Sequence, residues 1–469
     1  MLRRHWPFAL VLTAGAALRV ACEIAYRPAL FYPDSWGYLA TAHGPGIVGF
    51  APLRPSGYPI VLKVLSVVGD GLLATTLVQH LAGLATGAVV YALLAHYGVR
   101  RPLATVGGAV VVLDAWAIAL EQYVLSEALF GLLVALAVAS SLVGTKRAAG
   151  SGAALAFAGL ALAAASLMRP VGLFAVPAWL IWMAWARVGA RAALAGIVAL
   201  ALPLLVYSGV HASKTGTFGL TQADGWFLYG RVGPIASCNG IDVDRAARAL
   251  CRQPPGAADE RQSFFMFARE SPARQAFGGI SADHDKQART NRILRHFAIQ
   301  VIEHRPGAYL KLVGGDFLRF MRPGPHALYR EDRTVEFPER ARIAFDDPRI
   351  RRRLFPGVRP HASAPSGALR SYARVVHTSR PLIALVTLLS LVALGVGARR
   401  RDPRAQAVFL ALATGVFVLL GSAATAAFAL RYLVPLVAEF AIAATLSVEL
   451  LTRAAGEGRR AAHGGLARP

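Results

Sequence analysis

The chain has 469 residues, of which 55% are hydrophobic and 16% are charged, and its formal net charge is +24 at pH 7. Its mean hydropathy of +0.47 excludes an ordinary soluble domain, whose exterior must be solvated. The positive charge does not indicate nucleic acid, because the arginines are spread over many loops without an aromatic platform or a basic helix motif. We therefore expect a membrane protein with no nucleic-acid partner, whose exterior arginines suit lipid headgroups or phosphate.

About ten runs of Ala, Val, Leu, Ile and Phe are long enough to cross a hydrocarbon core of about 30 Å. These runs must be helices, since the backbone finds no water in the hydrocarbon. The fold class is therefore an all-α polytopic membrane protein with a mixed exterior soluble subdomain. The expected spans are 6–25, 71–96, 103–119, 125–143, 151–167, 171–186, 192–209, 381–398, 405–428 and 432–451.

Basic residues occupy every second connection between these spans. If the N-terminus is cytoplasmic, all short basic loops fall on the cytoplasmic side, as the positive-inside rule requires. We expect a multi-pass plasma-membrane protein with both termini cytoplasmic and its active site exterior. We expect the first span to be a membrane helix and not a cleavable signal, because no small-residue cleavage site follows it. The basic residues are Arg3, Arg4, Arg100, Arg101, Lys146, Arg147, Arg187, Arg191, Arg399, Arg400, Arg401, Arg404, Arg453, Arg459 and Arg460.

Two polar stretches, 26–70 and 210–380, interrupt the membrane pattern, and this topology places both outside. The predicted domains are an N-terminal transmembrane core at 1–209, an exterior subdomain at 210–380, and C-terminal transmembrane helices with a cytoplasmic tail at 381–469. A short apolar helix is expected from Tyr58 to Val68. Within the second stretch, a helix is expected at 286–304, and the spacing from His296 to Met321 predicts a helical face interrupted at Pro306.

The three cysteines differ in setting. Cys22 lies inside the first span, where it is expected to fill the apolar core. Cys238 and Cys251 fall in the second exterior stretch, an oxidising setting in which two nearby thiols can pair. Spacing alone cannot establish the required geometry, so the pairing stays open. No spacing of Cys and His suits a metal ion.

Asp34 follows the first span directly, inside the aromatic sequence YPDSWGY. A carboxylate at the outer membrane boundary is partly desolvated, so its pKa can rise toward a value that suits a general base. The alternative is that Asp34 caps a helix beginning at Ser35, a position that Asp favours.

Other ionisable residues fall at the same predicted face. Glu121 and Glu127 lie at the exterior turn between the third and fourth spans, Arg169 lies at the next exterior turn, and Arg431 lies at the last. Charged residues at or within spans are costly and mark functional sites by default, although each alone also suits an interfacial anchor or a snorkelling side chain. His80, inside the second span, either lines the same cavity or is a packed core histidine.

Five stretches of the membrane part resemble the GT-C glycosyltransferases that use polyprenyl-phosphate sugars. That group includes the protein O-mannosyltransferases of glycosyltransferase family 39 and the aminoarabinose transferases that act on lipid A. The order of the stretches is that of the family. They are YPDSWGYLATA from Tyr32, LRPSGYPIVL from Leu53, LVQHLAGLATG from Leu77, YVLSEALF from Tyr123 with MRPVGLFAVP from Met168, and ALRYLVPLVAEF from Ala429.

The resemblance implies roles for several residues. Asp34 matches the acidic residue that activates the acceptor, and Glu127 matches a second acidic residue that often faces it. Protein O-mannosyltransferases usually carry two adjacent acidic residues at the first position, whereas Ser35 follows Asp34 here, which argues against that branch.

The leaving phosphate gains charge as the anomeric bond breaks, and Arg is suited to hold it. Arg54, Arg169 and Arg431 are the candidates for this role, with Tyr58 and His80 as further substrate-binding residues. The membrane part of the chain, 1–209 and 381–469, contains no Asp-x-Asp motif. The resemblance therefore implies a metal-independent reaction without a cofactor.

We expect an inverting hexosyl- or pentosyltransferase that moves a sugar from a polyprenyl-phosphate donor to a glycan, lipid or protein at the exterior of a bacterial plasma membrane. One alternative is a flippase or transporter of lipid-linked saccharides, although the inverted repeats and broken helices of transporters are not evident. Another is a non-catalytic protein of cell-envelope assembly.

Overall fold

The computed structural model describes residues 5–465 apart from 47, 68–70, 145–150, 242, 244, 257–259, 325–334, 342–351 and 353–360. In these residues the chain folds into helices and forms no strand, with only isolated bridges between Leu30 and Tyr123 and between Ala51 and Arg54. The protein is an all-α polytopic membrane protein, as the composition predicts.

Each of the ten predicted spans is a helical segment. Among the described residues, eight are long and apolar enough to cross a membrane, and the segments 152–168 and 170–185 are apolar but shorter. The eight are α1 (Trp6–Ala25), α4 (Gly71–His96), α5 with α6 (Arg101–Val112 and Ala115–Gln122), α7 (Glu127–Gly144), α10 (Ala190–Thr215), α18 (Arg380–Arg400), α19 (Arg404–Thr425), and α20 with η7 and α21 (Leu430–Leu433, Val434–Leu436 and Val437–Gly465). The two shorter ones are α8 (Ser151–Met168) and η2 with α9 (Pro170–Phe174 and Ala175–Trp185).

Two of the spans are broken for local reasons. The third divides at Asp114, whose carboxylate accepts hydrogen bonds from the backbone N–H groups of Trp116 and Ala117 at 2.8 and 3.0 Å and so caps α6. The last divides at Val434–Leu436, where Pro435 cannot continue the hydrogen-bond ladder of a helix. The second break directly follows α20, which contains a residue of the site described below.

Small residues let the helices of the bundle approach one another closely. A Cβ on Gly159 of α8 would overlap the carbonyl of Gly196 in α10, and one on Gly131 of α7 would lie 2.8 Å from the carbonyl oxygen of Pro435. Such contacts are typical of helix pairs in membranes. The second of them sets the start of α7 beside η7.

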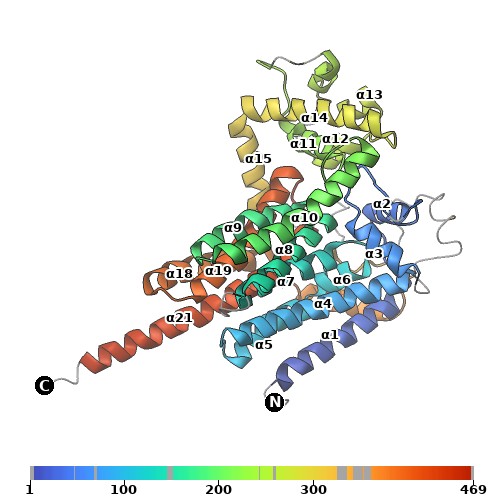
Figure 1. Cartoon of the computed structure of the whole chain (residues 1–469). Coiled ribbons are helices and arrows are strands. Elements are labelled where there is room, and N and C mark those ends of the chain that lie inside the picture. Colours follow the sequence, from blue (N-terminus) through green and yellow to red (C-terminus); the bar gives the residue numbers. More distant parts are fainter. Residues whose placement is uncertain are drawn as a thin grey trace.

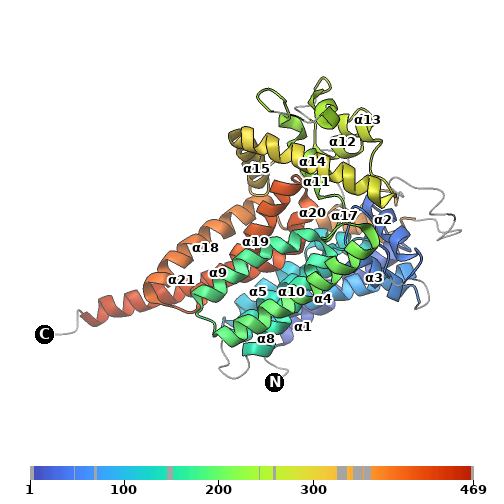
Figure 2. The ribbon, with the colours of Figure 1, turned by 45° about the horizontal axis from the view of Figure 1, so that its top comes forward.

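The two ends of the bundle differ. At one end, Arg100 after α4 forms an ion pair of 3.3 Å with Glu449 of α21, and Arg453 donates to the Gly98 carbonyl at 2.9 Å. The last turns of α21 lie away from α11–α14 in Figures 1 and 2. Several predicted basic connections therefore meet opposite the subdomain. Which end faces the cytoplasm stays a prediction, and Arg3, Arg4, Lys146, Arg147 and the side chains of Arg459 and Arg460 lie outside the described residues.

A helical subdomain with its own core stands on the other end of the bundle (Figure 1). Trp226, Tyr229, Phe265 and Phe297 are buried in that core. Its principal helices are α11 (Asp224–Val232), η3 (Gly233–Ile235), η4 (Arg245–Cys251), α12 (Gln262–Phe267), α13 (Pro272–Phe277), α14 (His284–His304) and α15 (Pro306–Arg319). The predicted interruption at Pro306 is confirmed, since α14 ends and α15 begins there.

Hydrogen bonds join the subdomain to the end of α19. The Tyr309 hydroxyl donates to the Ala424 carbonyl at 2.9 Å, and the Gln262 amide donates to the Thr425 carbonyl at 2.8 Å. The helix α17 (Pro365–Val375), which the sequence groups with the subdomain, packs instead against α1 and α6. The range 210–380 thus contains both a separate core and a segment that covers the bundle.

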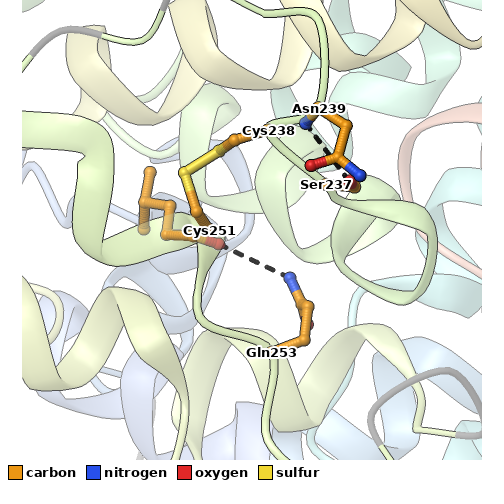
Figure 3. Close-up of a disulfide and its surroundings, with 6 residues drawn as sticks. Ser237, Cys238, Asn239, Cys251 and Gln253 are labelled. Carbon is orange, nitrogen blue, oxygen red and sulfur yellow. Dashed lines mark hydrogen bonds between the residues drawn. A yellow bond between two sulfur atoms is a disulfide. The ribbon is translucent and has the colours of Figure 1, made fainter.

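A disulfide between Cys238 and Cys251 closes a loop of the subdomain (Figure 3), and their Cα atoms lie 5.5 Å apart. The pairing that spacing left open is therefore present in the structure. Cys22 is a buried free thiol.

Candidate functional site

The site begins in the segment that follows α1. Leu30 donates its backbone N–H to the Gln122 carbonyl at 2.9 Å and accepts from Val124 at 3.0 Å, so this segment is tied to the corner between α6 and α7. The helix α2 (Pro33–Ala42) then starts, and the Tyr32 backbone N–H donates to the Ser35 hydroxyl at 2.9 Å. Asp34 lies in the first turn of α2 and does not cap a helix at Ser35, so the capping alternative is wrong.

Two arginines hold the carboxylate of Asp34. Arg54 Nη2 lies 2.6 Å from Oδ1, and Arg431 Nη1 lies 2.8 Å from Oδ2. Burial alone raises the pKa of Asp34, but the charges of Arg54 and Arg431 outweigh it and hold that pKa well below its usual range. The expectation that desolvation raises this pKa is therefore wrong for the free protein, because it did not include the two guanidinium groups.

Glu127 is the second carboxylate of the site. It is the first residue of α7 and is 1% exposed, and it forms an ion pair with Arg169. Arg431 Nη1 lies 3.7 Å from Glu127 Oε1, so this arginine stands between the two carboxylates. The sequence prediction grouped these residues, and the structure brings them together.

The five charged groups come from segments far apart in the chain. Asp34 lies on α2, Arg54 on the loop before α3 (Gly57–Leu65), Glu127 on α7, Arg169 between α8 and η2, and Arg431 on α20. We call these five residues the site cluster. Three guanidinium groups against two carboxylates leave one formal positive charge. An excess of this sign in a partly desolvated site favours an anionic ligand.

Tyrosine rings cover the arginines of the site cluster. The guanidinium carbon of Arg54 lies 5.1 Å from the centroid of Tyr38, and that of Arg431 lies 4.6 Å from Tyr32. The ring of Tyr432 lies 5.3 Å from Arg169 and 5.2 Å from Arg431. Each cation–π contact is worth about 0.5–1 kcal/mol when exposed and more when desolvated. The rings therefore help hold the guanidinium groups in place.

Tyr58 packs against Tyr38, the ring that covers Arg54. It is fully buried on α3, donates its hydroxyl to Gln79 at 2.6 Å, and meets the Tyr38 ring edge to face at 4.8 Å between centroids. The Gln79 amide in turn donates to the backbone carbonyls of Glu121 and Tyr123 at 2.7 and 2.8 Å. Tyr58 thus links Tyr38, which covers Arg54, to the corner between α6 and α7.

His80 belongs to a different group of residues. Its Nδ1 lies 2.8 Å from Glu121 Oε2, and its Nε2 lies 2.8 Å from Gln122 Oε1 and 3.9 Å from Glu23 Oε2. Both ring nitrogens are therefore engaged by side chains within the bundle. The geometry favours the packed-histidine interpretation over contact with a substrate.

Arg19, which the sequence interpretation missed, completes this second group. Its Nε and Nη2 donate to the two carboxylate oxygens of Glu121 at 2.8 and 2.7 Å, and its Nη1 donates to the Val112 carbonyl at 2.8 Å. An arginine in the middle of an apolar span was the available signal. We call Arg19, Glu23, His80 and Glu121 the buried cluster.

A small cavity lies between α4, α5, α6, α7 and the start of α21. Its volume is about 40 Å³, and Glu121 and Glu127 both line it. This volume suits a few water molecules and excludes a sugar or a lipid tail. Among the described residues, no group of three or more His, Cys, Asp and Glu side chains is arranged to hold a metal ion.

Comparisons with known proteins give one weak structural likeness. No protein-family model and no curated protein matches the chain. A similar solved structure is the archaeal oligosaccharyltransferase AglB from Archaeoglobus fulgidus, in complex with an inhibitory peptide and a dolichol-phosphate. The match has 12% sequence identity and a TM-score of 0.44, and it covers 100% of this chain and 53% of that chain. The chain therefore spans about half the length of that protein, and a score this low supports no conclusion about function.

Proposed function

We propose that the protein is an inverting glycosyltransferase of the GT-C type, which moves one sugar from a polyprenyl-phosphate donor to a cell-envelope acceptor. The observation that carries the proposal is the site cluster, where three arginines exceed two carboxylates by one positive charge at the boundary of a membrane bundle. A phosphate that links a sugar to a lipid supplies the matching negative charge, and guanidinium groups bind phosphate oxygens with two parallel hydrogen bonds.

The chemistry assigned to the site is a single displacement. The acceptor hydroxyl oxygen bonds to the anomeric carbon as its proton passes to Asp34. The bond from that carbon to the phosphate oxygen breaks, and its electron pair stays on the phosphate. Arg54, Arg169 and Arg431 stabilise the charge that develops there, a contribution that increases in the transition state. Attack opposite the leaving phosphate inverts the anomeric centre.

The exterior location of the site belongs to the same proposal. The subdomain stands at the site-cluster end of the bundle and contains a disulfide, a bond that persists in oxidising compartments. The opposite end gathers Arg100, Arg400 and Arg453, in agreement with the positive-inside rule. Together these features support a plasma membrane orientation with both termini cytoplasmic. A glycan, a lipid and a protein all remain acceptors under this proposal, with no cofactor or metal required.

The proposal is tested with purified protein in nanodiscs, supplied with radiolabelled polyprenyl-phosphate sugars and membrane-extract acceptors. We expect transfer that persists in EDTA and falls by about 10²–10⁴-fold in Asp34→Asn, the range for loss of a general base. The control is Asp283→Asn, which changes the net charge equally at the exposed start of α14, where Asn also caps a helix well.

The possible outcomes separate the alternatives. Absence of transfer from every donor, combined with movement of lipid-linked saccharide between leaflets, would replace the proposal with a flippase. Equal transfer by wild type and Asp34→Asn would remove Asp34 from the mechanism.

A further inference from the structure

Each carboxylate oxygen of Asp34 is paired with an arginine. Oδ1 is paired with Arg54 at 2.6 Å and Oδ2 with Arg431 at 2.8 Å. Two adjacent guanidinium groups favour the ionised form of a carboxylate and so make it a weak base toward a hydroxyl proton. The basicity of the residue that best fits the base is therefore lowered by two of the arginines that best fit the phosphate.

We propose that the phosphate of the donor and the carboxylate of Asp34 compete for the guanidinium groups of Arg54 and Arg431, so that donor binding releases Asp34 to act as the base. This inference rests on the proposed function and adds an order to it, in which the donor binds before the acceptor reacts.

Charge and geometry support the exchange. The site cluster has one more guanidinium group than carboxylate, so a phosphate is attracted while Asp34 is still ionised. Arg431 already stands between two anions, 2.8 Å from Asp34 and 3.7 Å from Glu127, so a small rotation changes its partner. Arg169 has its own carboxylate in Glu127. The two arginines that hold Asp34 are thus the ones available to rearrange.

The exchange prevents proton abstraction before the donor is bound. A hydroxyl-bearing acceptor, or water, that enters the site before the donor meets a carboxylate already held in two ion pairs. Only the complex with the donor contains both the sugar to be attacked and a released base. The arrangement therefore limits proton abstraction to the state in which it leads to transfer.

The competition is a coupling between two ligands of the same arginines, and such a coupling is reciprocal. If phosphate weakens the hold on Asp34, then removal of the Asp34 charge must strengthen phosphate binding. This consequence can be measured without knowledge of the sugar or the acceptor.

The experiment measures the binding of radiolabelled undecaprenyl phosphate to protein in nanodiscs. We expect Asp34→Asn to bind this lipid at least about fivefold more tightly than wild type, the lower end of typical coupling between linked sites. Asp283→Asn removes one negative charge from the subdomain surface, and we expect this variant to bind the lipid as wild type does. Undecaprenol, which lacks the phosphate, is expected to show no difference among the three proteins.

A second measurement uses the wild-type chain and so does not depend on the folding of a variant. Infrared difference spectra of protein labelled with ¹³C-aspartate, recorded before and after addition of undecaprenyl phosphate, report the carboxylate band that is missing in Asp34→Asn. Release from the arginines is expected to shift that band.

The outcomes distinguish this inference from the function on which it rests. Equal or weaker lipid binding by a folded Asp34→Asn, or an unchanged Asp34 band in a protein that binds the lipid, overturns the competition and leaves the glycosyltransferase proposal standing. If wild type binds undecaprenyl phosphate no better than undecaprenol, both fail.

Discussion

The site cluster and the buried cluster lie on either side of the corner between α6 and α7, yet they are built differently. The buried cluster projects from three helices, α1, α4 and α6, and its paired side chains are between 3% and 9% exposed. The site cluster comes mainly from loops and helix ends, and its side chains reach 16% exposure at Asp34 and 21% at Arg54. The site cluster has one excess guanidinium group, whereas the buried cluster has one guanidinium group against two carboxylates, and its Arg19 is matched by both oxygens of Glu121.

This difference teaches how to separate a structural ion pair from a binding site in a membrane protein. A buried pair with complete partners holds helices together, and the loss of one partner is costly because the other charge is left unpaired. A cluster with one unmatched charge and partial exposure can exchange a partner for a ligand. The first should respond to mutation in stability and the second in activity.

The largest expected effect is on stability in the buried cluster. Arg19→Met leaves the carboxylate of Glu121 without its guanidinium partner, so we expect the free energy of unfolding to fall by about 3–5 kcal/mol. The double variant Arg19→Met with Glu121→Leu should recover part of that loss. Thermal unfolding in nanodiscs measures both. Loss of transfer with unchanged stability would instead place Arg19 in the catalytic machinery.

Next in size is an effect on activity in the site cluster. Arg431→Gln leaves Asp34 paired with Arg54 and Glu127 paired with Arg169, so the fold should lose little. Removal of a donor that stabilises developing charge costs about 10²–10³-fold in kcat. We expect a loss of transfer in that range with near-normal unfolding. A variant that keeps its activity would show that Arg431 does not bind the leaving phosphate.

A smaller effect is expected from the ring that covers two arginines. Tyr432→Leu removes the cation–π contacts to Arg169 and Arg431, each worth about 0.5–1 kcal/mol or more. Initial-rate measurements should show KM for the donor rising by roughly 5–30-fold, the equivalent of the two contacts together. Tyr432→Phe, which keeps the ring, is the matched control. Equal KM values for the two variants would assign the ring no role in holding the arginines.

The smallest expected effect is a shift in pH dependence. Burial raises the pKa of Asp34, but the charges of Arg54, Arg431 and Arg169 lower that pKa by more than burial raises it. The carboxylate of Glu127 also faces this group through Arg431. A base with a lowered pKa stays ionised as the pH falls, so the acidic limb of kcat/KM for the donor lies below the ordinary aspartate range near pH 3.9. In the donor complex the arginines are shared with phosphate. The acidic limb of kcat should therefore lie roughly 0.7 pH unit above that of kcat/KM, the equivalent of a fivefold coupling. Coincident limbs would contradict the competition.

Much of the site was accessible from the sequence because ionisable residues are rare in apolar segments. Asp34, Arg169 and Arg431 lie between predicted spans and Glu127 lies at the start of one, and alternation of the spans places all four at one end. The same reasoning put Glu121 with Glu127, although Glu121 in fact pairs with Arg19, because helix rotation cannot be read from the length of a span. It also gave His80 a possible place in the cavity, whereas Glu121 and Gln122 engage both of its nitrogens.

The sequence by itself determined the positions of the apolar helical segments, the break at Pro306 and the end of the bundle at which charged residues gather. Hydropathy and proline act locally, so these features need no knowledge of the rest of the chain. Only the tertiary structure decided that Arg54 and Arg431, 377 positions apart in the sequence, hold the two oxygens of one carboxylate. Ion pairing depends on distances of about 3 Å between side-chain atoms, and these are established by how the helices rotate and pack. The protonation of Asp34, and with it the order of the proposed reaction, follows from that packing.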